Sequence, residues 1–577
     1  MRIIKQVLAV TVTVVWIAAM ASAKKPKIAP DLQSVDSSST VDVIVQFKHT
    51  PNEVHHQKVR DRGGVLRTKL DFLKAAAYTV PAGAVQDLAN DPEVAHISPD
   101  HKLKGMLDLT AAAVNASAAW TAGWYGRGVG VAVIDSGISN EDDLNNSNRV
   151  LSQSVPGVPQ SPASGNSIVY AHSFVPGEDT NDHYGHGTHV AGILAASGQD
   201  SICRTCTRSL RGMAPLASII NLKVLDHNGE GSDSAVIAAI DAAIALKNQY
   251  NIRVINLSLG RPVFESYTVD PLCQAIEAAW KAGIVVVVAA GNDGRDNSQG
   301  TEGYGTITAP GNDPYVITVG AMKTEGTPTR SDDLIASYSS KGPTMIDHVV
   351  KPDIVAPGNQ VASLLAGGGA TLYTSYPQTW LPQSYYQPGH NNRSPKYYVL
   401  SGTSMATPVV SGAVADLLQA QPNLTPDQVK ATLMLTAYKN LPASSSVVDP
   451  ATRTVYTDYY DIFTIGAGYL DIQAALNSTT VATGTALSPT ANFDDSSGNV
   501  YLSFDPSTVW NTQPGWSDQS VWGNMTVEAS HAVWGTHAVW GTSTTEGFHA
   551  VWGTHAVWGT STTDALQATA ITVSGEN

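Results

Sequence analysis

A serine in the stretch LSGTSMATPVVSG, residues 400–412, has very little side-chain bulk around it. Ser404 stands between Thr403 and Met405, and the small residues that follow are typical of a helix. Its hydroxyl could cap that helix, a role in which serine is common. It could also act as a nucleophile at the start of a helix, where the helix dipole favours negative charge. This stretch alone leaves both interpretations open.

A serine nucleophile needs a base, a carboxylate that orients the base, and donors aimed at the developing oxyanion. Asp135 ends the apolar run VAVIDSGI, His186 stands between glycines in HYGHGTHVAG, and Asn292 follows VVVVAAG. Each has an ordinary alternative: a turn or cap aspartate, a structural histidine, or a turn asparagine. His186 and His189 could also suggest a metal site, but no acidic partner stands at matching spacing.

Taken in order, VAVIDSGI, HGTHVAG, AAGN and GTSMATP resemble the signature segments of the subtilisin-like serine proteases, the subtilases, over about residues 110–478. The resemblance implies that Ser404 attacks the scissile carbonyl, His186 takes its proton, and Asp135 holds the histidine. The Asn292 carboxamide and the Ser404 backbone N–H would form the oxyanion hole. This chemistry requires no cofactor.

The same resemblance implies a cleft in which an extended peptide adds a strand. NLSLG matches one edge of the cleft, NGEGS matches the other, and TITAPG would shape the primary pocket. Glu230 would favour basic residues upstream of the cut, or is simply solvated. The predicted substrate-binding residues are Gly229, Glu230, Gly231, Ser258, Leu259, Gly260 and Thr308.

The elements that position these residues follow from alternating apolar runs. This alternation predicts an α/β fold, a parallel β-sheet flanked by helices of the subtilisin-like kind, with sites at the carboxyl ends of strands. Asp135 and Asn292 both follow such ends. The runs predict strands at 128–135, 219–225, 253–259, 284–291 and 315–321, and helices at 186–196, 234–246, 271–283, 403–420 and 425–437.

The N-terminal part carries two further segments. Residues 1–23 have the basic start, apolar run and small-residue end of a secretory signal peptide, and the apolar run is short for the alternative, a membrane anchor. Residues 24–108 are predicted to be a propeptide, in which 41–103 form a small α+β unit with strands at 41–47, 75–83 and 94–100 and helices at 54–64 and 84–91. This unit resembles the inhibitory propeptide of subtilases. The resemblance implies self-cleavage around 104–110. We therefore expect a secreted protein, extracellular or at the cell surface.

The C-terminal extension, residues 479–577, contains repeats of HAVWGT. Their alternation suits short strands that turn at glycine. A β-rich unit that binds glycans or a surface, a spacer, and a low-complexity tail without a binding role all remain open. The predicted catalytic domain is 109–478.

Composition limits the partners and metals. A net charge of −15 argues against nucleic acid. We expect protein or peptide substrates, the propeptide as intramolecular inhibitor, no stable membrane span after signal removal, and a monomer. A local Cys203–Cys206 disulfide or plain thiols are favoured over a metal half-site, and an odd Cys273 remains. The Asn-rich calcium loop of many subtilisins is missing, so no metal ligand is predicted; Asp143 resembles a remnant, and structural calcium stays open.

The sequence thus predicts a secreted serine endopeptidase made as a self-processing preproenzyme. The alternative is a catalytically inactive subtilase scaffold that binds a surface through its Trp-rich repeats. The complete set of Asp135, His186, Asn292 and Ser404 argues against that alternative. The sequence does not distinguish a protease of broad substrate specificity from one of narrow specificity.

Overall fold

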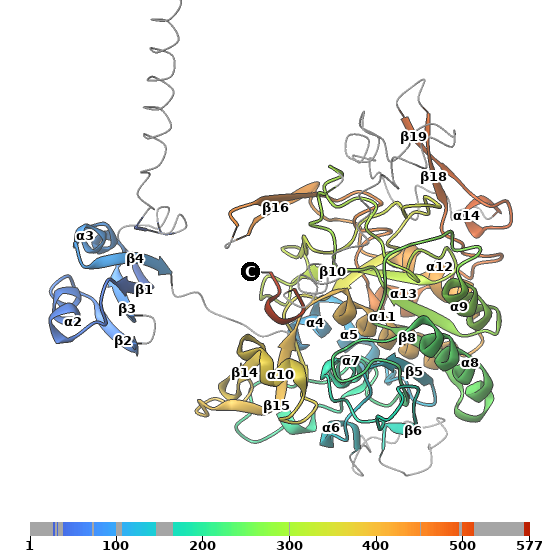
Figure 1. Ribbon diagram of the computed structural model, residues 1–577, viewed down its shortest axis with the longest axis horizontal. Coiled ribbons are helices and arrows are strands. Elements are labelled where there is room, and N and C mark those ends of the chain that lie inside the picture. Colours follow the sequence, from blue (N-terminus) through green and yellow to red (C-terminus); the bar gives the residue numbers. More distant parts are fainter. Residues whose placement is uncertain are drawn as a thin grey trace, which may run out of the picture. The chain divides into compact units, whose positions relative to one another are not determined.

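The computed structural model describes residues 27–28, 32, 39–71, 74–99, 107–145, 166–298, 300–449, 452–494, 499–512 and 571–576 (Figure 1). The predicted signal peptide, residues 104–106 of the predicted cleavage segment and the HAVWGT repeats lie outside the described residues. The chain divides into Met1–Leu103 and Lys104–Asn577, called unit 1 and unit 2 below.

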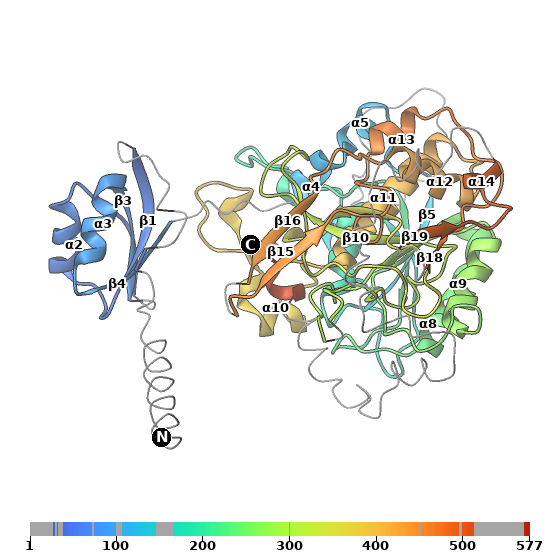
Figure 2. The same ribbon diagram turned by 90° about the horizontal axis from the view of Figure 1, so that it is seen from above.

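Unit 1 is an antiparallel sheet with helices packed on one face (Figure 2). The strand order is β2-β3-β1-β4. Val43, Val45, Tyr78 and Ile97 form its buried cluster, separate from that of unit 2. The elements are β1 (Thr40–Phe47), α2 (Glu53–Arg60), β2 (Val65–Leu70), β3 (Ala75–Pro81), α3 (Val85–Asn90) and β4 (Val94–Pro99).

The sequence pattern predicted every one of these elements except β2. Its segment VLRTKL has mostly exposed side chains, because β2 is an edge strand and buries little on either face. The helix predicted to reach the glycine pair at 63–64 ends earlier, at Arg60.

The main sheet of unit 2 has the order β11-β10-β9-β8-β5-β7-β6, and β12 pairs with β10. All pairs are parallel except β10 with β11. The strands β5 and β9 are buried throughout, as expected when helices cover both faces. The strands are β5 (Gly130–Asp135), β6 (Ile168–Ser173), β7 (Ser218–Lys223), β8 (Ile252–Leu257), β9 (Val285–Ala289), β10 (Ile317–Lys323), β11 (Leu334–Ile335) and β12 (Ile354–Pro357).

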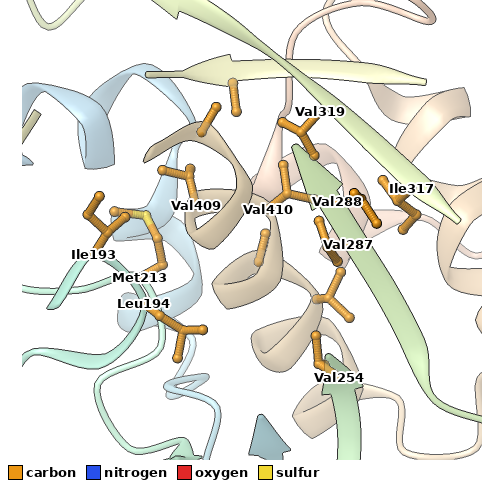
Figure 3. Packing of buried hydrophobic residues seen from close by; sticks show 14 of the residues in the cluster. Ile193, Leu194, Met213, Val254, Val287, Val288, Ile317, Val319, Val409 and Val410 are labelled. Carbon is orange, nitrogen blue, oxygen red and sulfur yellow. The ribbon is translucent and has the colours of Figure 1, made fainter. Parts of the chain in front are cut away.

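Helices cover the two faces of this sheet, which confirms the predicted α/β fold. α8 (Asp233–Tyr250) and α9 (Pro271–Lys281) pack on one face, and α7 (His186–Ala195) and α11 (Thr403–Ala420) pack on the other (Figure 1). Figure 3 shows how α11 is enclosed: Val409 points toward Ile193 of α7, and Val410 lies beside Val288 and Val319 of the sheet.

The region between β12 and α11 is a folded insert. Its strands form a small antiparallel sheet in the order β13-β15-β14. Leu372, Tyr397 and Tyr398 are fully buried, so the insert packs firmly on the unit. Its elements are β13 (Val361–Leu364), α10 (Thr371–Ser375), β14 (Trp380–Pro382) and β15 (Arg393–Leu400).

The predicted boundary at residue 478 does not separate two cores. Side chains beyond it join the same hydrophobic cluster as the sheet, namely Ala482, Val509, Trp510, Ile571 and Val573. No helix among the described residues is both long and apolar enough to cross a membrane. The remaining described elements are α4 (Leu107–Ala113), α5 (Ala116–Thr121), α6 (Asp142–Asn145), α12 (Pro426–Thr436), β16 (Ser444–Val448), β17 (Val455–Tyr459), α13 (Ile472–Asn477), β18 (Thr490–Asp494), β19 (Asn499–Ser503) and α14 (Val509–Thr512).

Candidate active site

The carboxyl ends of neighbouring strands bring the predicted residues to one edge of the sheet. Ile134 of β5 pairs with Leu257 of β8, and β8 pairs in turn with β9. Asp135 and Ser258 therefore follow neighbouring strand positions, and Asn292 lies in the turn just beyond β9. Helices α7 and α11 carry the predicted base and nucleophile in their first turns.

His186 and Asp135 form a buried pair. The Nδ1 atom of His186 lies 2.7 Å from Oδ1 of Asp135, and the two side chains are 9% and 0% exposed. Only a glycine fits at position 187, because a Cβ there would lie 2.3 Å from the carbonyl oxygen of Gly137. With Nδ1 engaged by the carboxylate, Nε2 is the ring nitrogen left to exchange a proton.

The environment of His186 favours its charged form. Burial lowers the pKa of His186, but the charge of Asp135 and the hydrogen bond to it outweigh burial and raise the pKa overall. The charge of Asp182 acts in the same direction. An imidazolium stabilised in this way is the state that a general base reaches once it has taken a proton.

Sequence reasoning missed Asp182, which fixes the first turn of α7. This buried carboxylate accepts hydrogen bonds from the backbone N–H groups of Gly185 and Thr188, both at 2.7 Å, and from the Ser136 hydroxyl at 2.9 Å. The Ser136 hydroxyl accepts in turn from the backbone N–H of Gly187 at 2.9 Å. The end of β5 and the start of α7 are thereby locked together. The N-cap of α7 is Gly185 and Asp182 lies three residues before it, so no capping motif in the sequence marks this aspartate.

Ser404 is held against the end of β8. Its hydroxyl donates to the carbonyl oxygen of Ser258 at 3.1 Å, and the Ser258 hydroxyl donates to the carbonyl oxygen of Ser404 at 2.8 Å. Asn256 donates to the Ser258 hydroxyl at 3.0 Å and accepts from Ser411 of α11 at 2.8 Å. Within the described residues no hydrogen bond joins Ser404 to His186, in keeping with substrate-free sites, where such bonds tighten only in the complex.

The capping interpretation of Ser404 is wrong. The N-cap residue of α11 is Gly402, with a φ of 139°, and Ser404 lies inside the first turn. A backbone conformation of this kind favours glycine. The serine hydroxyl is therefore not used to start the helix, and Ser404 is partly exposed while Thr403 and Met405 on either side are buried.

The side chain of Asn292 is oriented by the first residue of α11. Its Oδ1 atom accepts hydrogen bonds from the backbone N–H and the hydroxyl of Thr403 at 2.9 Å and 3.2 Å. Because the carbonyl oxygen of the amide is engaged, the Nδ2 group remains as a donor. It lies close to the start of α11, since a Cβ on Gly402 would be 3.2 Å from Nδ2.

One set of the predicted cleft residues lies beside this site. Ser258, Leu259 and Gly260 follow β8 directly. Thr308 lies against them, because a Cβ on Gly260 would be 2.6 Å from the Thr308 hydroxyl oxygen. The structure thus brings together the NLSLG and TITAPG segments that the sequence analysis singled out.

The other set, Gly229, Glu230 and Gly231, forms an exposed turn between β7 and α8. Gly229 lies against Tyr184, since a Cβ on it would be 2.6 Å from the Tyr184 ring. The Tyr184 and His186 ring centroids are 6.5 Å apart, so this turn lies on the histidine side of the site. The side chain of Glu230 is exposed.

The insert contacts the loop that carries the histidine. The backbone N–H groups of Thr371 and Leu372 donate to the carbonyl oxygens of His183 and Tyr184 at 3.0 Å and 2.9 Å. The Tyr398 hydroxyl donates to the carbonyl oxygen of Gly185. The insert therefore packs against the segment 183–185, which holds Tyr184 beside His186.

His189 is a structural residue and does not pair with His186 as a metal site. Its Nε2 atom lies 2.9 Å from the carbonyl oxygen of Val361, and burial lowers the pKa of His189 to about 3. The neutral ring donates to this carbonyl group and links α7 to β13 of the insert.

The surroundings of Asp143 do not fit calcium. One carboxylate oxygen of Asp143 accepts from the Ser197 hydroxyl and the Asp200 backbone, and the other accepts from Tyr397. The ammonium group of Lys396 lies 2.6 Å from Asp142 and 3.4 Å from Asp200. A cation from the insert thus offsets part of the charge of this acidic cluster.

Within the part of the chain that the structure describes, Glu178, Asp226 and His227 have ligand atoms close enough to hold a metal ion. The ammonium group of Lys223 already lies 3.0 Å from the Glu178 carboxylate, so a lysine offsets the negative charge of this group. Cys203 and Cys206 form a disulfide, while Cys273 is a free, buried thiol whose pKa is raised by burial.

Known proteins are similar in sequence to this chain over most of its length. The subtilase family, peptidase S8, matches residues 126–468. Serine protease AprX of Bacillus subtilis (strain 168) is 32% identical over 410 residues, 68% of this chain and 81% of that protein. Subtilisin E of the same strain is 34% identical over 411 residues, 70% of this chain and 86% of that protein. The chain therefore belongs to the subtilase family of serine endopeptidases.

Proposed function

We propose that Ser404, His186 and Asp135 carry out peptide hydrolysis in this endopeptidase. The buried 2.7 Å contact between His186 and Asp135, at the sheet edge where α11 also begins, is the observation that carries the proposal. Such a pair orients the imidazole and stabilises its charged form.

In the first half-reaction, Ser404 Oγ forms a bond to the scissile carbonyl carbon while its proton moves to Nε2 of His186. The negative charge on the carbonyl oxygen is stabilised by Nδ2 of Asn292 and the backbone N–H of Ser404. His186 then gives the proton to the leaving amine as the C–N bond breaks. Water hydrolyses the acyl-enzyme by the same steps, with His186 as the base.

The substrate is an extended stretch of protein or peptide. Segment 258–260 would pair with it on one side and turn 229–231 on the other, with Thr308 at the primary pocket. The proximity of the first segment and Thr308 supports this placement. Glu230 would contact basic side chains upstream of the cut, because its own side chain is exposed and acidic.

Unit 1 is proposed to be the inhibitory propeptide of a secreted, self-processing precursor. It has its own buried cluster and its own sheet, so it can be a separately folded inhibitor. Subtilases typically need no cofactor for catalysis and often bind structural calcium. The chemistry proposed here uses only side-chain and backbone groups of this chain. No observation favours the inactive scaffold.

The test is the intact mass of the purified wild-type chain beside Ser404→Ala. We expect the wild-type chain to lose the segment before about residue 110 and the variant to keep it. Maturation of both chains would show that another protease makes the cut. The proposed activity would then have to be tested by an assay of peptide hydrolysis alone. If neither chain is cut and neither hydrolyses peptides, the proposal is wrong.

A further inference from the structure

The segment Ile571–Glu576 lies far along the chain from the site, yet it packs beside the turn that precedes the nucleophile (Figure 1). Ile571 and Val573 are buried in the core of unit 2. The backbone N–H of Ser401 donates to the carbonyl oxygen of Thr572 at 2.9 Å. The segment is therefore an integral part of unit 2, although residues 513–570 lie outside the described chain.

The side chain of Glu576 enters a buried pocket, called here the Glu576 pocket, whose lining residues come from four separate segments of the chain. They are Arg295, Lys323, Ser337 and Asn359. The Glu576 side chain is 2% exposed, so its charge has been withdrawn from water almost completely. Burial of a carboxylate is costly unless the protein supplies charge and hydrogen bonds in return.

The pocket supplies both. One carboxylate oxygen of Glu576 accepts from Arg295 at 2.8 Å and from the Ser337 backbone at 2.9 Å, and the other lies 2.9 Å from the ammonium group of Lys323. The Ser337 hydroxyl also donates to the carboxylate oxygen that Arg295 contacts. The buried Lys323, the partly buried Arg295 and two donors from Ser337 converge on one carboxylate, which is more than an incidental surface ion pair provides.

The pocket also recognises the backbone of the segment. Asn359 donates from Nδ2 to the carbonyl oxygen of Glu576 at 2.6 Å and accepts at Oδ1 from the Glu576 N–H at 2.8 Å. Gly575 has a φ of +62°, and a Cβ on it would lie 2.3 Å from the Ser401 hydroxyl oxygen. The fit therefore requires a glycine followed by a glutamate, which is a specific sequence.

We propose that the Glu576 pocket is a carboxylate-binding site whose ligand is this chain's own segment Ile571–Glu576, which acts as a latch. Because Trp510 is buried in the same unit, residues 513–570 are then attached to unit 2 at both ends.

The experiment uses the full chain with Ser404→Ala, so that self-digestion is absent and the outcome does not depend on the proposed activity. Glu576→Gln keeps the shape of the side chain and removes its charge. Glu265→Gln, at an exposed acidic residue, is the matched control. We expect Glu576→Gln to lower the melting temperature of unit 2 and the control to leave it unchanged.

A second measurement uses a chain that ends at Ala570 and a capped synthetic peptide, acetyl-ITVSGEN-amide, labelled with a fluorophore. Lys323 also lies 3.2 Å from Glu325 and Arg295 lies 3.8 Å from Asp449, so the shortened chain keeps partners for both cations and should still fold. We expect the peptide to bind the shortened chain and to raise its melting temperature. A peptide with glutamine in place of glutamate should bind at least about tenfold more weakly.

Equal melting temperatures for the parent, Glu576→Gln and shortened chains would overturn the proposal. Equal binding of the two peptides would also overturn it, because a carboxylate-binding site must distinguish them. Binding of the glutamate peptide to the full-length parent chain as tightly as to the shortened chain would show that the segment does not occupy the pocket, and would overturn the latch.

Discussion

At the scale of single residues, the histidine pair sets how the proposed reaction depends on pH. His186 must be neutral to accept the proton of Ser404, and its pKa is raised above the ordinary 6.5. The fraction of neutral His186 grows as the pH rises through that pKa. The acid limb of kcat/KM should therefore have its midpoint above 6.5. A pH profile with a chromogenic peptide measures this, and a midpoint at or below the ordinary value would contradict the prediction.

Asp135→Asn should change both the rate and the profile. Without the carboxylate, burial is the main influence left on the imidazole, so the pKa of His186 falls and the acid limb moves to lower pH. The rate should drop by about 10⁴-fold, because the amide no longer holds the reactive tautomer. An unchanged acid limb in this variant would show that Asp135 does not control the histidine.

Asn292→Ala should lower kcat by about 10²–10³-fold with little change in KM, because the lost donor acts only on the developing oxyanion. Thr403→Ala is the matched control. It removes one of the two donors that hold the Asn292 amide and leaves the backbone N–H in place, so its effect should be much smaller. Similar losses for the two variants would contradict a direct role for Asn292.

Most of the candidate site could be predicted because its residues stand next to short, characteristic motifs. Asp135, His186, Asn292 and Ser404 each follow or begin a regular element, so the sequence reports their position in the fold. Asp182 could not be placed in this way. Its partners, on β5 and in the first turn of α7, meet only when the sheet is assembled.

At the scale of elements, the insert supports unit 2 through its own strand β15. Lys396 on that strand lies among acidic groups near α6, and burial raises the pKa of Glu141 in this cluster to about 7. A carboxyl group with a raised pKa binds more protons folded than unfolded. Stability therefore falls as the pH rises from about 4.5 to about 7.

Lys396→Met should make the free energy of unfolding depend more steeply on pH, because it removes the cation that opposes the charge of the acidic groups. We expect the free energy of unfolding to fall by about 1 kcal/mol at pH ~5 and by more at pH ~8. Denaturant unfolding in the Ser404→Ala chain measures this, and Lys396→Arg should behave nearly as the parent does. A loss that shrinks as the pH rises would reverse the assigned sign.

The central strands β5 and β7–β10 and the helices that cover them were predictable because their runs are long, apolar and regularly bounded. The strands β6, β11 and β12 of the same sheet were not predicted. β2 and the insert were less so, for opposite reasons. The edge strand β2 exposes most of its side chains, so no alternation marks it. The insert buries Tyr397 and Tyr398 through contacts with α6 and the histidine loop, which no local period reveals.

At the scale of the whole molecule, the division into two units suggests how the proposed precursor works. Unit 1 expressed alone, residues 24–103, should inhibit peptide hydrolysis by the mature enzyme. Val43→Asp should abolish this, because it puts a charge into the core of unit 1. Steady-state kinetics with added unit 1 provides the measurement. Equal inhibition by both forms would show that a folded unit 1 is not required.

The contact between Ser401 and Thr572 also bears on how long a molecule keeps working. One protease molecule can cleave another. A cut within residues 513–570 would leave the segment Ile571–Glu576 held only by non-covalent contacts. Once that segment diffuses away, the turn ahead of Ser404 loses a hydrogen-bond partner and its core contacts. We expect such a clipped molecule to lose activity faster on storage than an intact one.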